Sequence, residues 1–92
     1  MKVKWIKGNI EPPENGEYYV IREVVKTDEN ITLPKGYIEI DTDYFNIEHK
    51  EWIALGKNNP YYKILAWANI LHFDIPEELK GKINCYFGVD IK

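Results

Sequence analysis

Two segments in the first half of the chain carry the hydrophobic patterns of β-strands. Residues 17–26 (EYYVIREVVK) put apolar side chains on both faces of an extended chain, which predicts a central strand covered on both sides. Residues 37–45 (YIEIDTDYF) instead alternate between two different faces. The apolar face carries Ile38, Ile40, Thr42 and Tyr44, and the acidic face carries Tyr37, Glu39, Asp41 and Asp43. This alternation predicts a half-buried strand whose acidic face lies in water.

The connection between these two segments predicts an antiparallel hairpin. It contains Pro34 and Gly36, which favour turns, and the two segments are neighbours in the chain. In an antiparallel pair, directly opposite residues point to the same face of the sheet. We therefore expect Arg22 to lie opposite either Glu39 or Asp41, in a cross-strand pair that helps to set the register.

The second half of the chain predicts shorter elements. Residues 51–55 (EWIAL) and 83–89 (INCYFGV) are candidates for a third and a last strand. A short helix is predicted near residues 75–80, because Pro76 and two glutamates stand at the start of this segment and Gly81 follows its end.

Residues 61–73 (YYKILAWANILHF) fit two different elements. One is a helix that begins after Asn59-Pro60, and the other is a strand over residues 63–69. Periodicity does not decide between them. In the strand, Leu65 and Trp67 would share one face, and Ile64, Ala66 and Ala68 the other. We expect Trp67 in the core, because the ILAWA run gives it apolar neighbours on both sides.

Length and composition predict one small globular domain over residues 1–92. Hydrophobic residues make up 45% of the chain and charged residues 29%, which are ordinary globular values. Aromatic residues make up 14%, and tyrosine and tryptophan favour the half-buried surfaces of sheets. Together with the strand patterns, this predicts a mainly β fold (α+β at most), an antiparallel β-meander with one short helix.

Charge and hydropathy argue against several classes of partner. A net charge of −3 is unfavourable for binding nucleic acid or an anionic membrane. No apolar run approaches the roughly 18 residues of a membrane span, and the N-terminus lacks the apolar stretch of a secretory signal. Cys85 is the single cysteine and has no partner for an internal disulfide. We therefore expect a cytoplasmic protein.

The acidic strand face is the first candidate for chemistry. Glu39, Asp41 and Asp43 could bind a hard cation through their oxygen atoms. We interpret them instead as a weak acidic patch, a solvated strand face that Arg22 on the neighbouring strand partly neutralises. No divalent-cation site is expected.

The histidines and the cysteine do not form a recognisable site. His49 and His72 lack the HExxH or CxxC context of a zinc site, and although His72 and Asp74 could form a ligand or acid–base pair, we expect His72 to cap an apolar edge. Cys85 has apolar neighbours, which disfavour the reactive thiolate and predict a buried, unreactive thiol. Neither a GxSxG motif nor a glycine-rich phosphate loop is present. We expect no enzyme, no metal and no cofactor.

Tryptophan, proline and glycine recur at characteristic places along residues 5–79. The places are Trp5, Pro12-Pro13-Glu14-Asn15-Gly16 before the hydrophobic Tyr19-Val20-Ile21, then Trp52, Ala66-Trp67 and Pro76-Glu77. In this arrangement the chain resembles a small uncharacterised domain family of bacteriophages and prophages. It departs from that family where Asn69 to Ile75 separate the last tryptophan from the proline. The resemblance implies a bacterial setting, a β-rich fold and a strand over residues 63–69, but it implies no activity.

We therefore expect a non-enzymatic accessory protein of phage or prophage type that acts as a protein-interaction module. Tyrosines suit such surfaces because they combine an apolar ring with a polar tip. The candidate interaction surface consists of Tyr18, Tyr37, Tyr61 and Tyr62. The partner is another protein or a second copy of the chain, and neither nucleic acid nor a membrane.

Two alternatives remain open. In one, the chain is a small-ligand or carbohydrate-binding domain with Trp5 or Trp52 as a stacking platform. In the other, the acidic patch imitates the phosphates of nucleic acid and occupies a basic site on another protein. The net charge of −3 is small for such a mimic, so this hypothesis ranks last.

Overall fold

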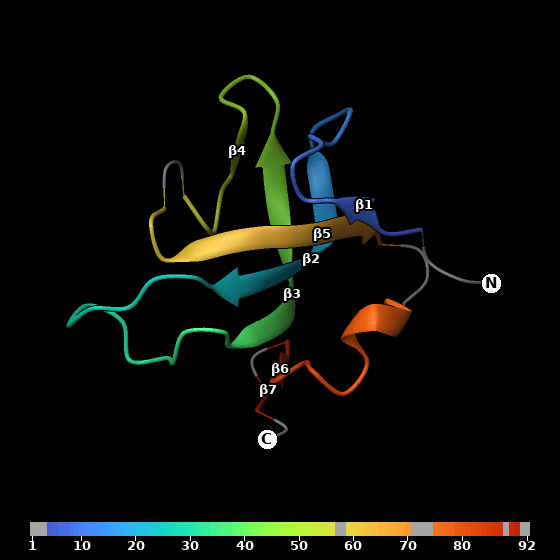
Figure 1. The fold of residues 1–92 in the computed structure, drawn as a ribbon. Coiled ribbons are helices and arrows are strands. Elements are labelled where there is room, and N and C mark those ends of the chain that lie inside the picture. The colour runs from blue at the N-terminus through green and yellow to red at the C-terminus, as the bar shows by residue number, and fades with distance from the viewer. Residues whose placement is uncertain (1–3, 57–58, 71–74, 88, 91–92) are drawn as a thin grey trace.

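A single curled β-sheet organises the chain, as the computed structural model shows (Figure 1). It describes residues 4–56, 59–70, 75–87 and 89–90. The strands are β1 (Ile6–Lys7), β2 (Gly16–Val24), β3 (Ile38–Asn46), β4 (Glu51–Trp52), β5 (Tyr62–Asn69), β6 (Cys85–Tyr86) and β7 (Val89–Asp90), and one 3-10 turn, η1, spans Glu77–Leu79. The order across the sheet is β1-β5-β2-β3-β6-β7, and β4 also pairs with β3.

The predicted fold class is confirmed, because the sheet is mainly antiparallel and the predicted helix is reduced to η1. The segment 61–73, which fitted either element, contains strand β5. The third predicted strand is shorter than expected and consists of the two residues of β4. Residues 83–89 do not form one strand, since they contain β6 and only the first residue of β7. One strand pair differs in direction, since β6 lies parallel to β3.

The central hairpin has one of the two registers that were predicted. Strand β2 lies between β3 and β5, and Arg22 stands directly opposite Glu39. The Arg22 Nε atom donates to Glu39 Oε1 at 2.6 Å, and an Nη atom lies 3.5 Å from Asp41 Oδ2. The two faces of β2 are both covered, which also confirms its prediction as a central strand: Val20 and Ile21, consecutive residues, are each fully buried.

A β-bulge in β5 changes which of its residues share a face. Ile21 pairs with Ala66 but Arg22 pairs with Ile64, so Leu65 is an extra residue opposite β2. Ile64 consequently packs on the same side of the sheet as Trp67, and Leu65 packs on the other. The expected grouping of Leu65 with Trp67 is therefore wrong, because the strict period of two does not survive the bulge.

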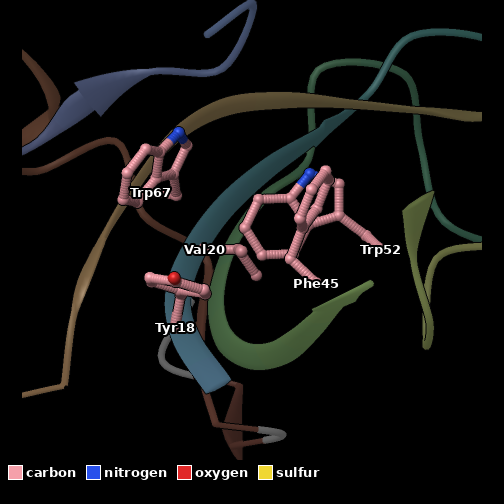
Figure 2. Packing of buried hydrophobic residues seen from close by; sticks show 5 residues of the cluster. All are labelled: Tyr18, Val20, Phe45, Trp52 and Trp67. Atoms are coloured by element: carbon pink, nitrogen blue, oxygen red, sulfur yellow. The ribbon is translucent and has the colours of Figure 1, made fainter. Parts of the chain in front are cut away.

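Two separate cores cover opposite faces of the sheet. The aromatic cluster consists of Tyr18, Val20, Phe45, Trp52 and Trp67 (Figure 2). The aliphatic cluster consists of Ile21, Ile38, Ile40, Ala66 and Ile83. Trp67 is 5% exposed and Cys85 is 4% exposed, which confirms the predicted burial of both. Residues of the chain's end, including Leu79 and Ile83, cover the aliphatic side.

The two clusters lie at different ends of β3, and this reverses the predicted burial of its second half. Ile38 and Ile40 belong to the aliphatic cluster, whereas Phe45, on the opposite face, belongs to the aromatic cluster. Tyr44 was expected to share the buried face of Ile38 but is 46% exposed, and Asp43 was expected in water but is 4% exposed. Both expectations are wrong because the sheet curls and its covered face changes along the strand (Figure 1).

Candidate functional site

Tyr18 does not belong to an interaction surface. It is 4% exposed, its ring makes edge contacts with Trp67 and Trp52 at centroid distances of 5.1 and 6.0 Å, and its hydroxyl donates to Glu14 O at 2.7 Å. Burial raises the pKa of this hydroxyl, and the Glu14 carboxylate adds to the rise. Tyr18 is thus a core residue, and its prediction as a contact residue is wrong.

The other three candidate tyrosines gather where β2 ends. Tyr37 O accepts the N–H of Val24 at 2.9 Å, and Tyr61 O accepts the N–H of Val25 at 2.8 Å. All three rings are half-buried. The Tyr61 hydroxyl donates to Asp28 Oδ2 at 2.9 Å. This hydrogen bond attaches the loop after β2 to the residue that precedes β5.

Tyr62 is held in a similar way by intramolecular contacts. The Arg22 guanidinium lies over its ring at 5.7 Å from the centroid, a cation–π arrangement. Desolvation raises the pKa of Tyr62, with Glu39 adding to the rise. These contacts account for the positions of Tyr61 and Tyr62 without an external partner.

The acidic patch divides into carboxylates that serve the fold. Glu39 and Asp41 both face Arg22, and Asp41 Oδ1 also accepts the N–H of Thr42 at 2.8 Å. Asp43 is buried and does not belong to a solvated patch, so its prediction there is wrong. Its Oδ1 accepts from Tyr44 N at 2.7 Å and Ala54 N at 2.8 Å, and its Oδ2 accepts from Leu55 N at 3.2 Å.

Asp43 should therefore hold the turn after β4. An Asp43→Ala variant would leave three backbone N–H groups without their acceptor, which we expect to lower the free energy of unfolding by about 1–3 kcal/mol. Asp43→Asn retains an amide oxygen for two of them and should lose less. Urea denaturation followed by circular dichroism measures both variants, and equal losses would show that the hydrogen bonds contribute little.

No cluster in the described parts of the chain has the composition of a metal site: nowhere do three or more His, Cys, Asp or Glu side chains gather suitably. His49 is exposed, and its backbone N–H donates to Asn46 Oδ1 at 3.1 Å. The predictions for His72 and Asp74 lie outside the described residues.

Two short strands, β4 and β6, pair with the outer edge of β3, and among the described residues neither of them pairs with the stretch around Thr42. We call this stretch the gap. The even-numbered residues of β3 direct their backbone groups to this edge: Ile40 O accepts the N–H of Phe87, and Tyr44 O accepts the N–H of Ile53, both at 2.8 Å. Thr42 lies between them, and its N–H is already bonded to Asp41. Its carbonyl points to the same edge and accepts no hydrogen bond from the described residues.

Large apolar side chains surround this gap, and we call them the edge patch: Tyr19, Tyr44, Ile53 and Phe87. Ile53 is 51% exposed and Phe87 44%. The rings of Tyr19 and Phe87 are 6.0 Å apart, and Tyr19 stands opposite Thr42 in the register. On the other side of Thr42, a hollow of about 290 Å³ is lined by Glu17, Thr42, Asp43, Tyr44, Ile53 and Ala54. Thr42 thus lies between the Tyr19–Phe87 ring pair on one side and the hollow with Tyr44 and Ile53 on the other.

The backbone at Phe87 has an uncommon conformation, in the tight turn that connects β6 to β7. Phe87 has a φ of 51°, in the left-handed region that bulky residues rarely adopt. Such strain of about 1–3 kcal/mol persists where the surrounding structure imposes it. Here it turns a large aromatic ring outward next to Tyr19.

Sequence reasoning did not select Ile53 or Phe87, and it assigned Tyr44 to the buried face. One signal was available for Ile53: it follows Trp52 directly, and consecutive strand residues point to opposite faces, so a single core can bury only one of them. For Tyr44 and Phe87, exposure depends on the curl of the sheet and the positive φ, which the local pattern does not encode.

Of the two stacking platforms of the ligand-binding alternative, Trp52 is buried in the aromatic cluster and Trp5 is partly buried against the aliphatic cluster. A second hollow of about 320 Å³ lies where β1 meets β5, lined by Lys7, Gly8, Asn9, Lys63, Ile64 and Leu65. Among the described residues, no tryptophan lines this hollow or the one at the edge patch.

The comparisons with known proteins give no match for this chain. No protein-family model, curated protein or solved structure matches it. Within the described residues, no helix is long and apolar enough to cross a membrane. The resemblance to phage domains therefore stays a prediction, and function has to be inferred from the edge patch itself.

Proposed function

We propose that the domain is a non-enzymatic protein-interaction module that contacts its partner through the edge patch. The observation that carries this proposal is the exposure of Tyr44 and Ile53 at the hollow and of Phe87 at the same edge of β3. Contiguous apolar surface with a polar rim is typical of protein contact sites, and tyrosine and phenylalanine are enriched in them.

A protein partner fits this surface better than a stacked sugar or other small ligand. The hollow is about 290 Å³, at the lower limit of the roughly 300–1,000 Å³ of small-molecule pockets, and it is open at the strand edge. Its lining supplies no tryptophan among the described residues. The accessory role in a phage or prophage belongs to the same proposal and rests on the sequence resemblance alone.

Selection of binding fragments tests the proposal. The immobilised full chain would select from a display library of bacterial and phage genome fragments, and each recovered fragment would then be measured against variants. Ile53→Asp places a charge within the apolar surface and should weaken binding at least about tenfold. Ile53 is exposed, so stability should change by no more than about 0.5 kcal/mol.

Ile10→Asp is the matched control. Ile10 is 52% exposed, like Ile53, but lies beside Trp67 of β5, on the opposite side of β2 from the edge patch. Fragments that bind through the edge patch retain their affinity for Ile10→Asp. Fragments that bind Ile53→Asp as tightly as the original chain would contradict the proposal.

A further inference from the structure

We infer that the partner segment at the edge patch is an extended polypeptide that places one apolar side chain in the hollow, one backbone N–H on Thr42 O and a lysine or arginine beside Glu17. This inference rests on the proposed function and specifies the chemistry of the partner. Three independent features of the site lead to it: the spacing of the gap, its hydrogen-bonding groups and its charge.

The gap is long enough for a short extended segment and too short for a full strand. It runs between Ile40 and Tyr44, whose carbonyls are occupied by Phe87 and Ile53. Four residues of strand span about 13 Å, at roughly 3.3 Å per residue. Two or three residues of a partner fit in that length, between β6 and the segment that follows β4.

The strand edge in the gap offers an acceptor and no donor. Asp41 accepts the N–H of Thr42, and Asp43 accepts that of Tyr44, so both outward N–H groups are occupied within the chain. Among the described residues, Thr42 O is the backbone group of this stretch that remains for a partner, which must therefore bring an N–H. A second copy of this edge would present the same acceptor, and two acceptors do not pair. This argues against edge-to-edge self-association.

The charge beside the hollow is negative. Glu17 stands directly opposite Tyr44 and is exposed, whereas the neighbouring Asp43 already accepts three backbone N–H groups. Among the described residues, neither lysine nor arginine lines this hollow. A cationic side chain of the partner would pair with Glu17 and lie near the ring of Tyr44, where cation–π attraction adds to the binding.

Binding of three synthetic peptides to the full chain tests the inference. The first is acetyl-Ser-Gly-Leu-Ser-Arg-Gly-Ser-amide, in which leucine and arginine share one face when the peptide is extended. The second has glutamate in place of arginine. The third has methyl groups on the backbone nitrogens of leucine, the serine that follows it and arginine, which removes their N–H donors. Amide resonances of the ¹⁵N-labelled protein report the affinity and the location of binding.

The arginine peptide should shift the amide resonances of Thr42, Tyr44 and Ile53 in a saturable way. The glutamate peptide should bind at least about tenfold more weakly, because it places like charges side by side. The methylated peptide should bind about fivefold more weakly, since it lacks the hydrogen bond to Thr42 O. Glu17→Gln should reduce the difference between the arginine and glutamate peptides, and Ile10→Asp should leave it unchanged.

Several results would overturn the inference while the proposed function stands. Equal affinities of the arginine and glutamate peptides would remove the role of charge, and an unweakened methylated peptide would remove the role of Thr42. Absence of shifts at millimolar arginine peptide, when selected fragments still depend on Ile53, would show that the edge patch binds a folded surface and not an extended segment. Failure of the proposed function itself would appear instead as fragments insensitive to Ile53→Asp.

Discussion

Replacement of Trp67 by alanine is expected to lower the free energy of unfolding by about 3–5 kcal/mol, a large share of the stability of a small domain. The indole is 5% exposed and contacts the ring of Tyr18 at 5.1 Å. Its Nε1 atom donates to Ile10 O at 2.6 Å and so attaches the loop before β2 to β5. Alanine would remove the packing and leave that carbonyl without its donor. Figure 2 shows Trp67 among the residues that would border the cavity.

Urea denaturation, followed by circular dichroism, measures this effect. Trp67→Phe keeps part of the ring contacts while it removes the N–H donor, so it should lose less stability than Trp67→Ala. Ile53→Ala is an exposed control that should change stability by no more than about 0.5 kcal/mol. A Trp67→Ala midpoint close to that of the unmodified chain would show that the aromatic cluster does not stabilise the fold as described.

Gly8→Ala should also destabilise the fold, by about 1–3 kcal/mol or more. A Cβ atom at Gly8 would lie 1.8 Å from Ile64 O and 2.6 Å from Ile64 C, distances that backbone atoms cannot accommodate. Ile64 is next to the bulge of β5, and Gly8 N–H donates to Leu65 O at 2.9 Å. The added methyl group would therefore push β1 away from β5.

Gly16→Ala is the matched control for this prediction. At Gly16 a Cβ would meet its nearest atom, in the ring of Tyr18, at 3.7 Å, an ordinary contact. Alanine there restricts the unfolded chain and should leave stability unchanged or raise it by up to about 1 kcal/mol. Thermal unfolding compares the two variants, and hydrogen exchange at Lys7 tests for the loss of β1. Similar effects of both substitutions would contradict the close approach of Gly8 to β5.

The role of Gly8 shows a limit of sequence reasoning that recurs at the edge patch. Gly8 and Asn9 lie in a turn in which the Ile10 N–H donates to Lys7 O at 3.0 Å. The requirement for glycine, however, comes from Ile64, far away in the chain. In the same way, the exposure of Tyr44 and Phe87 depends on the curl of the sheet and on the positive φ of Phe87.

The sequence by itself determined the features that depend on neighbouring residues along an extended chain. The apolar pattern of residues 17–26 identified the central strand, because a strand buried on both sides needs apolar side chains at consecutive positions. The charges on residues 37–45 limited the hairpin to two registers, with Arg22 opposite Glu39 or Asp41, since opposite charges favour cross-strand pairing. Burial of Trp67 and Cys85 followed from their apolar neighbours.

Only the tertiary structure decided which face of each strand is covered at each point. The bulge at Leu65 exchanged the faces of β5, and the curl of the sheet brought the aromatic cluster over Phe45 while leaving Tyr44 in solvent. Asp43 became a buried acceptor because the turn after β4 presents its N–H groups there. Burial depends on segments far apart in the sequence, and a period of two holds only while the same layer covers the strand. The edge patch is exposed because, among the described residues, neither β4 nor β6 pairs with the stretch of β3 around Thr42.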